Sequence, residues 1–454
     1  MKISAARVPA LAVASATLIA ASLAAQTPPQ TSFTLTLPNY NTIPIGQVGG
    51  LEGGAYIART NDASSNWYNP AGLALAKTSS VSSSAGTYQL LSLIPKDLQS
   101  EDSGGSTQQV PALVGIVIKK PFGDDRYTGG IAVVRTNSWS QQTDAQIDEL
   151  ESIPGRLLTY SADSEFRRVE ASLALAYADG GPWRFGANLS GSNTSLRAVG
   201  SVSDLLTEPT GLEAIQTSRR INGSSTQIRA AAGVQYQMTP QILLGGVVRS
   251  PGVTLFRSGD YSFDGQVSAG GESASITFFD PDVRFDYKLP FQVGMGAAMA
   301  LDRFELELDA TFSTGNSSYD FLRSEKQSTF IVDNGLGGPP VVTRLPVAAV
   351  QAETDAIVNI AFGGYYALTE NKVWKLHFGF NTDFSPVGDN DEFFTKVDLY
   401  SFALGISGET RHFIASLGAN YSFGNANDAP LAELLDSDIS VKAIAIIYSL
   451  AYRF

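Results

Sequence analysis

Few residues in this sequence are of the types that perform covalent chemistry. The chain has two histidines, His377 and His412, and no cysteine. Nothing in the spacing around the histidines supports a Ser–His pair with an orienting polar partner. The lack of cysteine excludes disulfides, thiolate metal sites and cysteine nucleophiles. We therefore expect that the protein is not an enzyme.

Metal, cofactor and nucleic-acid sites are equally hard to find. An acidic run with Asp144, Asp148, Glu149 and Glu151 has oxygen ligands suited to Ca²⁺, although such runs are more often solvated faces. No phosphate loop, zinc spacing or nucleotide fingerprint occurs. The net charge of −13 argues against binding to a phosphate backbone. We expect no metal, no cofactor and no nucleic-acid partner.

Apolar side chains in two predicted connections are the more promising candidates for ligand binding. They are partly at helical spacing and could present an apolar surface, or merely pack small helices at the rim. Arg156 could meet a carboxylate, although a solvated charge is the simpler interpretation. The candidate apolar residues are Leu150, Ile153, Leu157, Leu158, Leu205 and Leu206.

Alternating patterns bounded by turn residues predict fourteen strands that must position these side chains. Hydrophobic residues make up 43% of the chain and charged residues 17%, and there are 43 glycines. The predicted spans are 79–92, 110–120, 127–137, 163–178, 183–197, 223–238, 241–256, 283–300, 303–315, 352–368, 372–384, 394–407, 411–424 and 438–454.

The connections between these strands alternate in length. The even-numbered ones, such as Thr239-Pro240 and Leu301-Asp302, are tight turns, whereas the odd-numbered ones run to about 36 residues. This alternation is typical of a transmembrane barrel, which pairs short periplasmic turns with long external loops. The sequence thus predicts an all-β, 14-stranded antiparallel transmembrane β-barrel. Closing the sheet removes the open edge that lipid cannot solvate.

The final strand has two contrasting faces. Ile444, Ile446, Tyr448 and Leu450 alternate with mostly small residues, so one face suits lipid and the other a lumen. The C-terminal Phe454 resembles the signal that the barrel assembly machinery reads. Ser449 departs from that signal, which usually has Gly at this position. Aromatic residues near strand ends, including Tyr261 and Tyr287, are expected to form interfacial girdles.

The N-terminus has two segments that precede the barrel. Residues 1–25 have a basic start, an apolar stretch and small residues at 22–25, which predict a secretory signal peptide. Residues 26–78 are rich in small and turn-forming residues and cannot form a core alone. A 14-stranded barrel is too wide for its own side chains to fill. We expect 26–78 to be a hatch inside the lumen of the barrel, which spans 79–454.

The predicted hatch has one distinctive run. Its residues are Asn61, Asp62, Ala63, Ser64, Ser65, Asn66, Trp67, Tyr68, Asn69, Pro70, Ala71, Gly72 and Leu73. This run resembles the hatch signature of FadL/TodX-type outer-membrane transporters. Further similar elements are Leu289 to Gly294 and Asn381 to Val387, so the resemblance spans nearly the whole mature chain.

The resemblance implies passive uptake of hydrophobic small molecules, such as long-chain fatty acids or aromatic hydrocarbons, through a plugged barrel in the outer membrane. It also implies contact with membrane lipid and lipopolysaccharide, assembly by the barrel machinery, a monomer, and a sideways exit at a kinked third strand. The third strand here has Gly129-Gly130 and Arg135-Thr136-Asn137 but no clear family kink. An interaction barrel for secreted cargo and a porin for polar solutes are the alternatives.

Overall fold

The computed structural model describes residues 35–36, 39–40, 45–95, 107–150, 153–208, 211–269, 272–333, 335, 339–345, 349–388, 394–427 and 439–454. The predicted signal peptide lies outside these residues. Within the described segments, no helix is long and apolar enough to cross a membrane.

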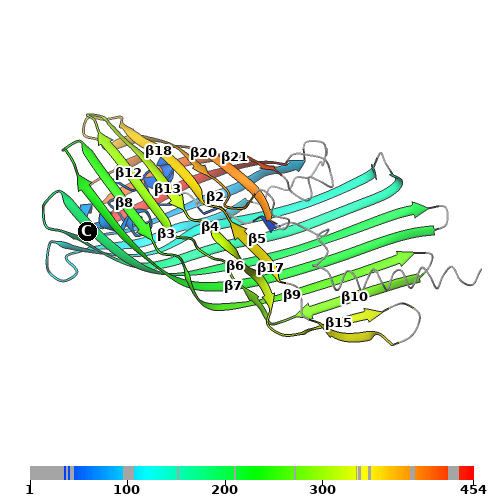
Figure 1. Cartoon of the computed structure of the whole chain (residues 1–454). Helices are drawn as coiled ribbons and strands as arrows, with labels where there is room; N and C mark the ends of the chain where they lie inside the picture. The colour runs from blue at the N-terminus through cyan, green and yellow to red at the C-terminus, as the bar shows by residue number, and fades with distance from the viewer. Residues whose placement is uncertain are drawn as a thin grey trace, which may run out of the picture.

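Fourteen of the described strands pair in sequence order into a closed antiparallel barrel (Figure 1). The barrel closes because the first of them pairs with the last, from Ser80↔Arg453 to Pro95↔Ile439. This confirms the predicted fold class. The strands are β2(Ser80–Pro95), β3(Thr107–Lys119), β4(Tyr127–Leu150), β5(Ile153–Ala178), β6(Trp183–Glu208), β7(Gly211–Gln237), β8(Ile242–Arg249), β12(Gln292–Ala300), β13(Phe304–Ser313), β18(Ile357–Ala367), β19(Trp374–Asp383), β20(Phe394–Glu409), β21(Phe413–Asn427) and β22(Ile439–Arg453).

The lipid-facing pattern of the last strand is confirmed. Ile446, Leu450 and Phe454 are 50%, 51% and 63% exposed, whereas Ala445 and Ile447 are buried. Apolar side chains stand outward in the same way on the other barrel strands, as a surface in contact with lipid requires. The predicted girdle positions Tyr261 and Tyr287 are wrong, because both rings are buried inside the molecule.

The third and fifth connections are strands, not loops with helical turns. β4 and β5 continue as one hairpin, in which Leu150 pairs with Ile153 and Asp148 with Leu157. β6 and β7 continue to Glu208↔Gly211. Alternating polar residues along both hairpins suit a sheet that has solvent on its outer side. We call this extended part of β4, β5, β6 and β7 the outer wall. The four strands therefore rise well beyond the rest of the barrel (Figure 1).

Two predicted strands are each divided in two. The span 241–256 breaks at Ser250-Pro251-Gly252, and 283–300 breaks between Phe285 and Gln292. Proline lacks a backbone N–H, so Pro251 and Pro290 interrupt the ladders. Beyond the break, the chain leaves β8 and pairs with the upper half of β7. The strands that extend this outer wall are β9(Val253–Ala269), β10(Glu272–Asp280), β15(Ser328–Asp333) and β16(Val341–Leu345).

A separate three-stranded sheet forms above β12, β13 and β18. Its members are β11(Val283–Phe285), β14(Asn316–Ser324) and β17(Val350–Thr354). We call this sheet the inner sheet, because its side chains join those of the outer wall in one apolar core. Tyr287, Phe321 and Phe278 lie in this core, with Phe166 and Tyr287 rings 5.0 Å apart. The short strand β1(Leu35–Thr36) pairs parallel with the start of β20.

Candidate functional site

The hatch occupies the lumen and is held by its own turns. It contains the 3-10 helices η1(Gly49–Glu52) and η2(Pro70–Leu75) and the single helical turn α2(Ser65–Tyr68). Gly53 and Gly54 have φ of 65° and 81°, which lets the chain reverse directly after η1. Asp62 accepts hydrogen bonds from the amide of Ser64 at 2.7 Å and from its hydroxyl at 2.5 Å before α2. Burial raises the pKa of this carboxyl.

Each residue of the Asn-Pro-Ala-Gly element has a structural task. Asn69 accepts from the amide of Ala71 at 3.1 Å and so caps η2, whose first residue is Pro70. The Asn69 amide donates to Ile57 O at 3.0 Å and to Val234 O of β7 at 3.1 Å. Gly72 lies so close to Thr60 that a Cβ would stand 2.3 Å from its carbonyl oxygen. The element therefore ties two hatch segments to the wall.

The two aromatic residues of the signature are buried. The Tyr68 hydroxyl donates to Ile45 O at 3.0 Å, and its ring lies edge-on to Tyr56. The guanidinium of Arg249 on β8 lies 5.3 Å from the Trp67 ring centroid and donates to the Trp67 and Tyr68 carbonyls. Asn61, by contrast, is exposed, with one 3.5 Å contact from the Tyr56 hydroxyl.

Glycines of the wall face the hatch around most of the barrel. A Cβ on Gly186 would stand 2.3 Å from the Ala71 nitrogen, and one on Gly363 would stand 2.1 Å from Glu52 O. Only hydrogen leaves room for this backbone-to-backbone approach. We call the set the glycine girdle, and it consists of Gly115, Gly130, Gly186, Gly233, Gly245, Gly294, Gly363, Gly379, Gly405 and Gly418.

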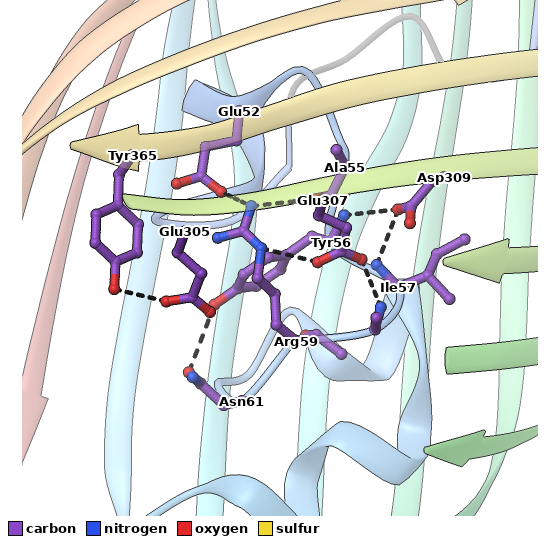
Figure 2. A network of polar contacts seen from close by, with 12 residues as sticks. Glu52, Ala55, Tyr56, Ile57, Arg59, Asn61, Glu305, Glu307, Asp309 and Tyr365 are labelled. Carbon is purple, nitrogen blue, oxygen red and sulfur yellow. Dashed lines mark hydrogen bonds and ion pairs between the residues drawn. The ribbon is translucent and has the colours of Figure 1, made fainter. Parts of the chain in front are cut away.

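Charged contacts fasten one side of the hatch to β13 (Figure 2). Asp309 accepts from the amides of Tyr56 at 2.7 Å and Ile57 at 3.0 Å. Glu307 accepts from the Ala58 amide at 2.5 Å, and its other oxygen lies 2.8 Å from Arg59 Nε. These hatch amides have no partner within the hatch's own helices, so the wall carboxylates satisfy them.

Arg59 and Glu52 complete this network from the hatch side. The Arg59 guanidinium pairs with Glu52 and with Glu307, and all three side chains are buried. Burial pushes the pKa of Glu52 upward, but Arg59 and His377 more than offset it, so the pKa lies below its ordinary value. Burial likewise pushes the pKa of Arg59 downward, and the carboxylates of Glu52 and Glu307 outweigh it and leave the pKa raised.

Sequence reasoning missed this network. A signal existed, because Glu305, Glu307 and Asp309 alternate along a strand that must cross a membrane. Acidic residues with period two belong on the lumen face, where they need partners. Arg59, the partner, stands two residues before the predicted signature. Its burial depends on the tertiary arrangement.

A cavity lies between the hatch and the β12–β21 side of the wall. It contains about 980 Å³ of empty space, including the part open to solvent. Ile57 and Trp67 of the hatch border it, and the wall contributes amides, hydroxyls and carboxylates. The wall side chains are Gln292, Asp309, Thr311, Asn359, Asn381, Asp383, Ser401, Asn420 and Ser422. Apolar Ile360, Ala361 and Leu399 of the wall also border the cavity, so its lining is mixed.

The predicted apolar loop residues are placed on the outer wall. Leu158 is buried on the same face of β5 as Tyr160, and Leu157, Leu205 and Leu206 are half-buried. Leu150, Ile153 and Arg156 lie in β4 and β5, and their side chains lie outside the described part. The larger apolar assembly is deeper, between the outer wall and the inner sheet, and was not predicted.

Solved structures share this fold over nearly their whole length. The toluene transporter TodX of Pseudomonas putida aligns with a TM-score of 0.59 at 14% identity, over 92% of this chain and 100% of its own. The FadL homologue of Pseudomonas aeruginosa aligns with a TM-score of 0.54 at 15% identity, over 93% and 100%. The CymD monoaromatic hydrocarbon channel aligns with a TM-score of 0.56 at 14% identity, over 91% and 99%. No family model and no curated protein matches the sequence.

Proposed function

We propose that this protein is an outer-membrane channel for the passive uptake of hydrophobic small molecules, and not an enzyme. It would be exported by the signal peptide of residues 1–25, with residues 26–78 as hatch and 79–454 as barrel. The apolar core between the outer wall and the inner sheet supports this proposal most, because it gathers many aromatic rings into one buried apolar cluster. The similar structures named for toluene and monoaromatic hydrocarbons agree with it.

The energetics favour capture by this core. Each buried CH₂ group of a ligand contributes about 0.8 kcal/mol, so a molecule of six or more carbons gains enough to leave water. Phe278 and Phe330 stack with centroids 4.5 Å apart, and Tyr261 lies 5.4 Å from Phe278. A ligand that enters between these rings would replace their contacts with one another by apolar contacts of the same kind.

Neighbouring phenylalanines on β10 provide a matched test. Phe278 is 2% exposed and faces the core, whereas Phe279 is 53% exposed on the opposite face. Purified protein in detergent is titrated with oleate and with toluene while tryptophan fluorescence is recorded. We expect Phe278→Ser to weaken binding about tenfold or more and Phe279→Ser to leave it unchanged. A flat response to both ligands in the unsubstituted protein would end the proposal.

A sideways exit for the ligand would lie where the β3–β4 ladder ends. The ladder between β3 and β4 stops at Leu113↔Val134, while β4 continues with β5 alone. Thr136 forms a bulge in the β4–β5 ladder just above this point. We propose that ligand leaves here, because the hatch packs closely against the glycine girdle and obstructs the axis of the barrel.

A disulfide across the gap tests this exit, since the native chain has no cysteine. Cysteines at Ala112 and Arg135 stand where the ladder would continue. The control pair replaces Val114 and Val133, which are already partners in the ladder. We expect oxidation of the first pair to stop transfer of toluene into the membrane of proteoliposomes without preventing binding. Equal transfer with both pairs oxidised would refute the sideways route.

The same proposal includes the partners of the protein in the membrane and its oligomeric state. The outward apolar surface would contact outer-membrane lipid, and the external wall would contact lipopolysaccharide. The C-terminal strand, which ends with Tyr452 and Phe454 both exposed, would be read by the barrel assembly machinery. Because β2 and β22 close the barrel within one chain, we propose a monomer. Light scattering of the detergent-solubilised protein tests this, and a dimeric mass would contradict it.

A further inference from the structure

Four arginines form a diagonal row on the outward face of the barrel wall, one on each of β4, β5, β6 and β7. Each has buried residues on both sides in the chain, so its own side chain stands on the outward face. The ladder registers place each arginine two residues from the position directly opposite the next one. Such diagonal neighbours are about 7–8 Å apart, within reach of long side chains. We call them the arginine row, and its members are Arg135, Arg167, Arg197 and Arg220.

The row begins at the outer margin of the apolar barrel surface. On β5, outward Leu173 is 62% exposed, and Tyr177 lies beside the turn that leads to β6. Arg167 stands ten residues from Tyr177 along this strand. A strand tilted by about 40° rises roughly 2.5 Å per residue, so ten residues span about 25 Å, the height of the apolar band. Arg197 stands fourteen residues from Trp183, the first residue of β6, which places it about 10 Å higher.

The arginine row has few partners of opposite charge. Glu165 forms an ion pair with Arg167. Two more carboxylates share the outward face, of which Asp163 is exposed and Asp260 accepts from the Asn222 amide at 2.8 Å. Among the described residues, the other three members of the row form no ion pair. Neighbouring guanidiniums repel one another, so an anion bound between them would relieve that repulsion.

We propose that the arginine row binds the phosphates of a lipopolysaccharide molecule whose acyl chains lie on the apolar strand surface below it. A guanidinium donates two parallel hydrogen bonds to one phosphate, and neighbouring arginines can share it. Phospholipid headgroups would reach only the lower end of the row, whereas lipopolysaccharide carries anionic sugars above its lipid phosphates. The inference rests on the proposed location in the outer membrane and not on which molecule the channel carries.

Native mass spectrometry of the full-length protein in detergent tests the proposal with three lipids. These are a short-core lipopolysaccharide, the same lipopolysaccharide after enzymatic removal of its phosphates, and phosphatidylglycerol. We expect the phosphorylated form to bind about tenfold or more tightly than the other two, the factor that corresponds to one hydrogen bond between charged groups. Equal binding of the dephosphorylated form would show that only the acyl chains are recognised. Equal binding of phosphatidylglycerol would show an ordinary headgroup contact, and either result would overturn the proposal.

Two ion pairs of the same spacing provide a matched control. Arg167 pairs with Glu165 two residues earlier, and Arg126 pairs in the same way with Asp124 in the tight turn before β4, at the opposite end of the barrel. We expect the double change Arg167→Gln and Arg197→Gln to weaken binding of the short-core lipopolysaccharide about tenfold. Arg126→Gln should leave it unchanged. Arg167→Lys should have an intermediate effect, because lysine keeps the charge and loses the paired hydrogen bonds.

A toluene titration of the same variants separates this inference from the uptake proposal. The row faces away from the apolar core, so the double variant should bind toluene as the unsubstituted protein does. Unchanged lipopolysaccharide binding in the double variant, with toluene binding intact, would overturn the arginine row and leave the uptake proposal standing. Absence of toluene binding in the unsubstituted protein, with selective lipopolysaccharide binding intact, would have the opposite meaning.

Discussion

Single polar side chains of the signature are important because they serve hatch and wall at once. Asn69 caps η2 with its oxygen and donates its amide hydrogens to a hatch carbonyl and to a wall carbonyl. Leucine or alanine at this position would remove the cap and both hydrogen bonds donated by the amide. A buried unsatisfied group costs about 1–3 kcal/mol.

Replacement of Asn69 by alanine is therefore expected to destabilise hatch docking by about 2–4 kcal/mol, which combines the lost cap and the two lost hydrogen bonds. Limited proteolysis and hydrogen exchange of residues 57–75 measure this loss. Asn61→Ala is the control, because Asn61 is exposed and makes one long contact. Equal protection of the two variants would contradict the assigned role of Asn69.

Glu52 is expected to control how the docking of the hatch weakens at acidic pH. Because its pKa in the folded protein lies below its ordinary value, the carboxylate stabilises docking above that ordinary value, about 4.3. The stabilisation is lost as the pH falls through the lowered folded value. We expect hatch protection to decline below about pH 4 and to decline less in Glu52→Gln. Exchange of residues 49–60 between pH 2.5 and 5 checks this, and a larger decline in the variant would refute it.

At the scale of the elements, the glycine girdle determines how closely the hatch and the strands approach. Gly186 and Gly191 lie on the same strand, β6. A Cβ at Gly186 would meet hatch backbone, whereas one at Gly191 would meet nothing within 4 Å. The two positions therefore separate a steric effect on the hatch from the intrinsic preference of valine for strands.

Gly186→Val is expected to displace the hatch and to destabilise the folded barrel by several kcal/mol, as overpacking against backbone does. Gly191→Val should be neutral or slightly stabilising. Retention of a heat-resistant fast-migrating band on gels measures barrel stability, and proteolysis of residues 45–78 measures hatch displacement. If both valine variants behaved alike, close packing at Gly186 would not be limiting.

At the scale of the whole molecule, the barrel and the outer wall are expected to face different solvents, lipid and water. Ile446, at the middle of β22, is 50% exposed on the lipid-facing surface of the barrel, and Val342, on β16 of the outer wall, is 63% exposed. The two side chains are alike in being apolar and exposed. Only the first belongs to a strand of the closed barrel.

Arginine at Ile446 is expected to destabilise the barrel by about 2–4 kcal/mol, since a charge at the bilayer midplane has no water. Arginine at Val342 should change stability by less than about 0.5 kcal/mol. Unfolding by guanidinium chloride in lipid vesicles measures both values. A similar cost at the two positions would show that the wall beyond the barrel is also covered by lipid.

The amino-acid sequence alone determined the strand periodicity, the tight turns, the closed barrel and the existence of a hatch. These follow from local rules: alternation sets the faces of a strand, and Gly, Pro, Asn and Asp set turns. Tertiary structure decided where the long external segments go. Alternating polar residues in 137–163 and 197–223 are compatible with loops until a neighbouring strand offers a ladder, as β4–β7 do for one another.

Tertiary structure also decided the partners of the hatch. Arg59 and His377 are 318 residues apart, yet both contact Glu52. Charge balance among buried groups is a property of the assembled volume and leaves no period in the sequence. The glycines of the girdle read as ordinary strand glycines until the hatch backbone is placed against them. Close packing and buried electrostatics are set by the three-dimensional arrangement, whereas the faces of each strand were already present in the order of its residues.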